Sequence, residues 1–241
     1  MEKIAHWTTK EDIGILTLKN PPQNFIKEPD FLSTERLLEL TKDVKGMLIT
    51  GFGKHFSAGA DLQSLKILSQ NKELLLSKLT YGNELLKCIE ELNIPVIAVV
   101  NGICFGAGLE IALSAHLRIV AKNSLFAFPE INHELIPGLG GIIRLLENIT
   151  KNEAVQLLLK GDVIDAEKAL SLHIADDLVP AATLMEHAIQ RIKRMTDCRS
   201  TEVIHCIMQA INNTRKMTRD DAIAAETRMF CELAARTNQI F

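Results

Sequence analysis

Short runs of apolar residues recur through the first half of the chain and predict buried strands. Each run has the length of a strand, and turn-forming residues such as Asn20, Pro21 and Gly51 follow the earlier ones. The runs cover residues 13–18, 46–50, 94–100, 117–120 and 125–128. Because they are largely apolar rather than alternating, they are typical of parallel strands covered on both faces.

Apolar residues at helical spacing predict helices between the strands and at the end of the chain. Residues 72–92 and 109–114 have this pattern, and from Ala181 onward it continues with little interruption. Alternation of strands and helices predicts an α/β fold with largely parallel strands. A boundary near Pro180 would divide the chain into a core of residues 1–180 and a helical region of residues 181–241.

Length and charge narrow the functional classes. The chain has 241 residues, which suits one large domain with a small appendage. Its formal net charge of −3 gives no reason to expect nucleic acid or an anionic membrane as a partner.

Cysteine usage and the N-terminus indicate the compartment. The five cysteines include no CxxC pair, which argues against a disulfide framework or a zinc site. The first residues lack the apolar core of a signal peptide, and the run at residues 94–100 is far too short to span a membrane. We therefore expect a cytoplasmic protein.

Two glycine-rich turns follow the same plan of buried strand, turn and helix. One covers residues 51–61 and the other residues 101–110. Glycine allows a ligand to approach the backbone closely, and the first N–H groups of a helix lack partners within that helix. Two such turns side by side could form an oxyanion hole, whose donors each stabilise a transition state by about 3–4 kcal/mol.

Nucleotide binding is the competing interpretation of these turns. Neither matches the P-loop pattern G-x-x-x-x-G-K-[ST]. The second reads G-x-x-x-G-x-G rather than G-x-G-x-x-G, although Glu130 lies about where a ribose-binding acid would stand. Plain connections between elements are a further alternative for glycine-rich turns.

Two glutamates are the candidate acid and base. Glu110 falls in the first turn of a predicted helix, where the helix dipole favours the ionised form that a base requires. Glu130 follows an apolar strand, and an apolar setting raises a carboxyl pKa, as an acid requires. Each could instead be an ordinary carboxylate at the end of an element.

Four segments resemble motifs of the enoyl-CoA hydratase (crotonase) family, in the same order. FSAGADL at residues 56–62 resembles F-x-A-G-A-D-[IL], and IPVIAVVNG at residues 94–102 resembles K-P-V-I-A-A-V-N-G. GAGLE at residues 106–110 resembles G-G-G-x-E. FPE at residues 128–130, followed by IPGLGG at residues 136–141, resembles the run PE…PG-x-GG.

The resemblance implies a fold and a site. It implies a spiral of ββα units followed by a helical region that forms trimers, often paired into hexamers. The N–H groups of Ala60 and Ala107 would hold a thioester oxygen, Glu110 would activate water, and Glu130 would protonate the α-carbon. The motif positions around them are candidate substrate-binding residues, namely Ala58, Asp61, Leu62, Gly106, Gly138 and Leu139. For Asp61, capping of the following helix is the simpler role.

The implied activity is addition of water across the 2,3-double bond of an acyl thioester, or its reverse, without metal or redox cofactor. Many relatives keep the oxyanion hole but lack one or both glutamates, and they isomerise, decarboxylate or dehalogenate. An isomerase or decarboxylase on the same scaffold therefore remains an alternative, as does a non-catalytic thioester-binding subunit.

Departures from the family pattern concern the carrier of the acyl group. Ala107 replaces the usual central glycine, and Gln63 stands where many relatives have lysine. The family's basic residues near its first proline turn are absent, and the chain is expected to lack the family's last helix. Lys27, Lys54 and Lys66 remain as candidate phosphate contacts. An acyl-carrier-protein thioester is therefore an alternative to acyl-CoA.

Overall fold

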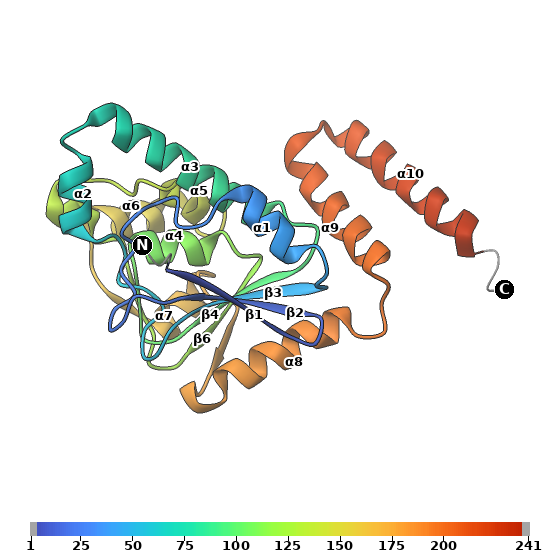
Figure 1. The fold of residues 1–241 in the computed structure, drawn as a ribbon, viewed down its shortest axis with the longest axis horizontal. Coiled ribbons are helices and arrows are strands. Elements are labelled where there is room, and N and C mark those ends of the chain that lie inside the picture. The colour runs from blue at the N-terminus through green and yellow to red at the C-terminus, as the bar shows by residue number, and fades with distance from the viewer. Residues whose placement is uncertain (1–3, 238–241) are drawn as a thin grey trace.

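A six-stranded sheet forms the centre of the molecule (Figure 1). The computed structural model describes residues 4–237. The strand order is β1-β2-β3-β4-β6-β9, with an antiparallel β1–β2 pair and parallel pairing elsewhere. A small second sheet has the order β5-β7-β8. The strands are β1 Ala5–Lys10, β2 Ile13–Leu18, β3 Gly46–Gly51, β4 Val96–Val100, β5 Ile103–Phe105, β6 Leu117–Ala121, β7 Leu125–Ala127, β8 Ile164–Asp165 and β9 Asp177–Val179.

Helices cover both faces of the main sheet. The α-helices are α1 Thr34–Thr41, α2 Leu62–Leu68, α3 Lys72–Glu90, α4 Ala107–Leu113, α5 Gly141–Leu146, α6 Lys151–Lys160, α7 Ala166–Ser171, α8 Leu184–Thr196, α9 Thr201–Lys216 and α10 Arg219–Thr237, with short 3-10 helices η1 Glu130–His133 and η2 Ala181–Thr183. The larger apolar core includes side chains of α1, α3 and α4 on one face. On the opposite face α8 buries Leu184, Ala188 and Ile192 against β2, β3, β4 and β6.

The five strands predicted from apolar runs are all present, as β2, β3, β4, β6 and β7. The strand predicted at residues 117–120 extends one residue further, to Ala121, as β6. The strand predicted at residues 94–100 begins at Val96, as β4, because Pro95 has no N–H to donate to a neighbouring strand. The strands β1, β5, β8 and β9 were not predicted. β1 is rich in polar residues, and the other three are two or three residues long, so pairing with neighbours rather than local sequence defines them.

The predicted helices are also present, with a shift that matters for the site. The helix expected at residues 109–114 is α4, and it begins two residues earlier, at Ala107. A short strand, β5, lies inside the second glycine-rich turn, so that turn is not a simple loop from strand to helix. The expected helical end of the chain is seen as α8, α9 and α10.

The last two helices lie at one side of the body (Figure 1). α10 packs along α9, and α9 is joined to the core by polar contacts from Asn212 to the Glu91 carbonyl and from Lys216 to the Glu91 carboxylate. The division of the chain at residue 180 stays a prediction, with α8 beyond it packed on the sheet. Within residues 4–237, no helix is long and apolar enough to cross a membrane.

Candidate active site

The two glycine-rich turns touch each other beside the sheet. An isolated parallel bridge joins Ser57 in the first turn to Cys104 in the second. Ser57 N donates to the Ile103 carbonyl at 3.1 Å, and Phe105 N donates to the Ser57 carbonyl at 3.0 Å. The first turn leads into α2, which is capped by the Asp61 side chain, and the second turn leads into α4. Because the turns touch, these two helices start close to each other.

Glycine is required where the turns meet. Gly59 has φ +95°, and a Cβ there would lie 2.8 Å from the Phe105 oxygen and 3.5 Å from the Ala107 nitrogen. Gly106 has φ +48°, and a Cβ there would lie 2.6 Å from Oε1 of Glu130. A side chain at either position would meet both backbone strain and a steric clash.

The N–H groups of Ala60 and Ala107 have no hydrogen-bond acceptor within the described part of the chain. Ala107 is the first residue of α4, where an N–H has no partner inside the helix. Both alanines line one cavity together with Glu110 and Glu130. The geometry therefore leaves two backbone donors available to a ligand in that cavity.

The cavity has a volume of about 170 Å³ and a largely aliphatic wall. Three of the six candidate substrate-binding residues line it: Asp61, Gly138 and Leu139. Lys27 also reaches it. The aliphatic side chains come from α2, α3 and the loop after η1, and include Leu65, Leu68, Leu75, Leu79, Leu135 and Ile136.

The other three candidates lie outside the cavity wall. Ala58 donates its N–H to the Gln23 carbonyl, and Leu62 begins α2 with half of its surface exposed. Gly106 is buried beneath Glu130. Their observed roles are to shape and pack the two turns.

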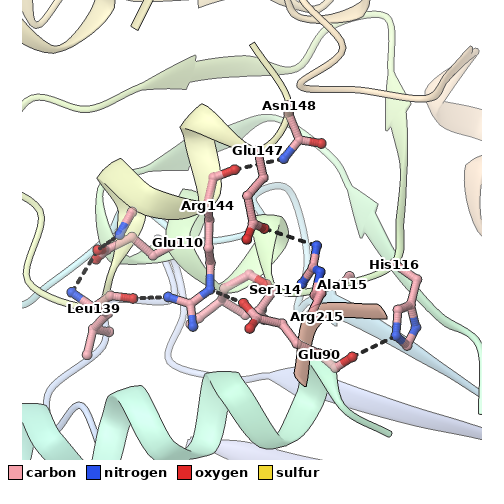
Figure 2. Close-up of polar contacts among 12 residues, drawn as sticks. Glu90, Glu110, Ser114, Ala115, His116, Leu139, Arg144, Glu147, Asn148 and Arg215 are labelled. Carbon is pink, nitrogen blue, oxygen red and sulfur yellow. Dashed lines mark hydrogen bonds and ion pairs between the residues drawn. The ribbon is translucent and has the colours of Figure 1, made fainter. Parts of the chain in front are cut away.

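Glu110 is buried, with 1% of its surface exposed. Its Oε1 accepts the N–H of Leu139 at 2.7 Å and the N–H of Gly141 at 2.8 Å (Figure 2). Burial raises the pKa of Glu110, while these two N–H groups and the positive charge of Arg144 oppose the rise. The expectation that the helix start would favour the ionised form was therefore wrong in its net direction. Every residue of α4 is buried, so loss of hydration outweighs the dipole.

Glu130 begins η1, separated by one residue from the buried segment Phe126, Ala127 and Phe128. Burial is the main cause that raises the pKa of Glu130 from 4.5 to about 7, and repulsion from Glu110 adds to the rise. Its Oε2 is buried without a hydrogen-bond partner among the described residues. The predicted apolar setting is confirmed, and Glu130 can hold a proton near neutral pH. Both carboxyl pKa values are raised, however, rather than pushed in opposite directions.

Sequence reasoning missed the residues that hold Glu110 in place. Leu139 was expected to bind substrate, but its N–H also binds Glu110, as does that of Gly141. Arg144 was not singled out, although it is a charged residue inside the apolar segment of α5 and is 7% exposed. A charge within an apolar helical stretch is the signal that could have found it, since such a group is buried only with partners.

Two backbone donors beside two carboxylates, in a cavity with aliphatic walls, are suited to acid–base chemistry on a carbonyl compound. The donors can polarise a carbonyl oxygen, and the carboxyl groups can move protons at neighbouring carbons. The fold and the site thus define an acid–base enzyme.

Comparison with known proteins identifies the family. The family model for enoyl-CoA hydratase/isomerase matches residues 8–239, and the chain belongs to this family. The 2,3-dehydroadipyl-CoA hydratase of Escherichia coli is 31% identical over 235 residues, which cover 94% of this chain and 88% of that protein. An enoyl-CoA hydratase structure from Thermoplasma volcanium is 26% identical with a TM-score of 0.85, covering 97% of this chain and 93% of the other. The predicted crotonase-like α/β fold with a C-terminal helical region is thereby confirmed.

One relative is much longer than this chain. The fatty acid oxidation complex subunit alpha of Shewanella frigidimarina is 34% identical over 231 residues. The match covers 91% of this chain but 32% of that protein. The chain therefore spans about a third of this relative.

The raised pKa of Glu130 predicts a pH-dependent cost to folding. The folded state favours the protonated form of Glu130. The stability that this form contributes is complete below the unfolded-state pKa of 4.5 and is lost as the pH rises through the folded-state pKa of about 7. Glu130→Gln stays neutral, so its free energy of unfolding relative to wild type should be higher at about pH 8 than at about pH 5. Urea unfolding at the two pH values measures this difference. Replacement of the exposed Glu73, as Glu73→Gln, is the control. The prediction would be contradicted if the difference in free energy of unfolding between Glu130→Gln and wild type were the same at both pH values.

Proposed function

We propose that this protein is an enoyl-thioester hydratase, which adds water across a 2,3-double bond or removes it. The observation that carries the proposal is the presence of Glu110, Glu130 and the free N–H groups of Ala60 and Ala107 around one cavity. Family membership and the hydratase names of the relatives support it. The cavity's aliphatic wall suits an acyl chain.

In the proposed mechanism the thioester oxygen accepts the N–H groups of Ala60 and Ala107. These donors stabilise the negative charge that develops on the oxygen as an enolate forms, by about 3–4 kcal/mol each. Glu110 takes a proton from water as the water oxygen bonds to C3, and Glu130 gives its proton to C2. A proton then returns from Glu110 to Glu130 through solvent. The steps use carboxyl and N–H groups, and they require neither a metal nor a redox cofactor.

Isomerisation is the second candidate, favoured by the state of Glu130. A carboxyl group with a pKa of about 7 and a buried oxygen without a partner can both accept and donate a proton. Glu130 alone could therefore carry a proton between C2 and C4 of an enolate held by the two N–H groups. Decarboxylation would need the same donors, and a non-catalytic subunit would need neither glutamate.

Neutral replacements of the two glutamates should separate these activities. Glu110→Gln and Glu130→Gln should each lower the kcat of hydration by about 10²–10⁴-fold, the usual contribution of an acid or base. Loss of the enoyl-thioester ultraviolet absorbance with crotonyl-CoA measures hydration, with Glu73→Gln as an exposed control.

Hydration at the wild-type rate by either variant would remove that glutamate from the mechanism. Retained double-bond isomerisation in Glu110→Gln, together with lost hydration, would assign the proton transfers at carbon to Glu130. Loss of both activities in Glu130→Gln is expected under either function.

We propose that the substrate is an acyl-CoA and that the enzyme makes only weak contacts with the nucleotide part of CoA. Lys27 lines the cavity, whereas the usual basic residues of the family are missing near the first proline turn. Remote parts of a substrate raise catalysis only where the enzyme contacts them. Replacing crotonyl-CoA with crotonyl-pantetheine should therefore lower kcat/KM by less than about tenfold, or ~1.4 kcal/mol. A loss of a hundredfold or more, on the order of 2.7 kcal/mol, would show strong nucleotide contacts and would remove the main support for an acyl-carrier-protein substrate.

We propose a trimer or a hexamer. α9 and α10 together expose a groove whose apolar wall includes Ile207, Ile211 and Phe230, each more than half exposed. Two helices of this kind are too few to bury such a surface by themselves. Sedimentation at micromolar concentration should give a trimer or hexamer, and Phe230→Glu should weaken it. A wild-type monomer would contradict this proposal.

A further inference from the structure

Arg144 is buried, and its guanidinium lies between the carboxylate of Glu90 and the carbonyl of Leu139 (Figure 2). Its Nε donates to Oε1 of Glu90 on α3, and its Nη1 donates to the carbonyl of Leu139. Its own carbonyl accepts a hydrogen bond from the Asn148 side chain at 2.8 Å. Arg144 therefore ties α3, α5 and the loop before α5 together.

The loop held by Arg144 is the one that binds Glu110. Leu139 donates its N–H to Glu110, and the next carbonyl along the chain is the one that Arg144 holds. The peptide that carries the Leu139 N–H is held from its other side, because Asn83 on α3 donates to the Gly138 carbonyl at 3.2 Å. Two side chains thus fix the orientation of the loop donors, and hydrogen bonds linked through one peptide strengthen one another.

The two loop donors share one oxygen of Glu110. Leu139 and Gly141 both bind Oε1, and Oε2 has no hydrogen-bond partner among the described residues. Oε2 is therefore the oxygen that can accept a proton from water in the cavity. A shift of the loop would turn the carboxylate and misplace that oxygen.

The charge of Arg144, like the hydrogen bonds that it makes to the loop, affects Glu110. The positive charge of Arg144 opposes the effect of burial on the pKa of Glu110. The charged groups at the cavity side of this site are Glu130 from η1 and Lys27 and Asp61 at the cavity wall. On the other side, the Arg144–Glu90 pair shares a pocket with further charged residues, namely Lys87, Glu91, Glu147, Arg215 and Lys216. Glu90 pairs with Arg144 and so offsets part of its charge.

We propose that Arg144 is the positioning residue for Glu110, holding the loop that orients it and favouring its ionised form, while Glu90 limits how strongly the Arg144 charge acts. This inference rests on the proposed hydratase function. Arg144 would touch neither the acyl thioester nor the attacking water.

The two partners of this ion pair should have opposite effects on the pH dependence of hydration. The lower apparent pKa of the kcat profile reports the base, and the upper one reports the acid. Arg144→Met removes a positive charge near Glu110, so the lower apparent pKa should move to higher pH. Glu90→Gln keeps an oxygen acceptor for Arg144 but removes the negative charge, so the lower apparent pKa should move to lower pH.

Steady-state hydration of crotonyl-CoA by the whole protein, measured across pH, tests this. Arg144→Met should lower kcat by roughly 10–100-fold, as expected for a misplaced catalytic group, with KM changed by less than about threefold. Arg144→Lys keeps the charge but not the fork that serves two acceptors. It should therefore lower kcat while keeping the lower apparent pKa near that of wild type.

A matched control is Arg118→Met, which also removes a buried arginine paired with a carboxylate, that of Asp176. It should destabilise the fold without moving the lower apparent pKa. The inference would be overturned if the lower apparent pKa moved equally in Arg118→Met and Arg144→Met. It would also be overturned if the pH profile of kcat were unchanged in both Arg144→Met and Glu90→Gln. If Arg144→Met does not fold, Glu90→Gln decides, because movement to lower pH supports the inference and no movement overturns it.

A measurement independent of activity separates this inference from the proposed function. The carbon-13 signal of the Glu110 carboxyl group, assigned by its loss in Glu110→Gln, can be titrated in each variant. Opposite displacements of its pKa in Arg144→Met and Glu90→Gln would support the electrostatic role even if wild type failed to hydrate crotonyl-CoA. That failure alone would count against the hydratase proposal, whereas coincident titrations in all variants would overturn the role of Arg144.

Discussion

The site depends on the close contact of two glycine-rich turns that are far apart in the sequence. Gly59 and Gly106 adopt positive φ where a side chain would strike the opposite turn or Glu130, and a Cβ at Gly108 would lie 2.6 Å from the Ser57 oxygen. This contact places the start of α4 against the first turn, so that the N–H groups of Ala60 and Ala107 line one cavity. A larger residue at Gly59 or Gly108 would force the turns apart and separate the two donors, and one at Gly106 would displace Glu130.

Burial then determines the chemistry of the carboxyl groups. Glu110 and Glu130 lose water, which raises both pKa values, but the two groups differ in what replaces the water. Glu110 receives two N–H donors and lies near Arg144, whereas one oxygen of Glu130 has no partner among the described residues. The N–H groups and Arg144 therefore oppose the rise in the pKa of Glu110, whereas repulsion from Glu110 adds to the rise in the pKa of Glu130. The two buried carboxyl groups thus differ in their hydrogen bonds.

Much of the fold follows from local sequence. Apolar runs predicted five strands, and helical periodicity predicted α3, α4 and the helical end of the chain, because burial of one side of an element imposes its period on the sequence. The polar strand β1 and the short strands β5, β8 and β9 could not be predicted in this way. The hydrogen bonds of β5, β8 and β9 are with strands distant in the sequence, whereas β1 pairs with the adjacent β2 but has too few apolar residues to signal a strand.

The sequence by itself determined which groups were candidates for chemistry: the motif order identified Glu110, Glu130, Ala60 and Ala107. Tertiary structure decided what each group can do. The net direction of the Glu110 pKa, the role of Leu139 and the position of Arg144 all depend on α3, α4 and α5 meeting at one point. A carboxyl pKa is set by the water, charges and donors within a few ångströms, and those neighbours come from segments that only folding brings together.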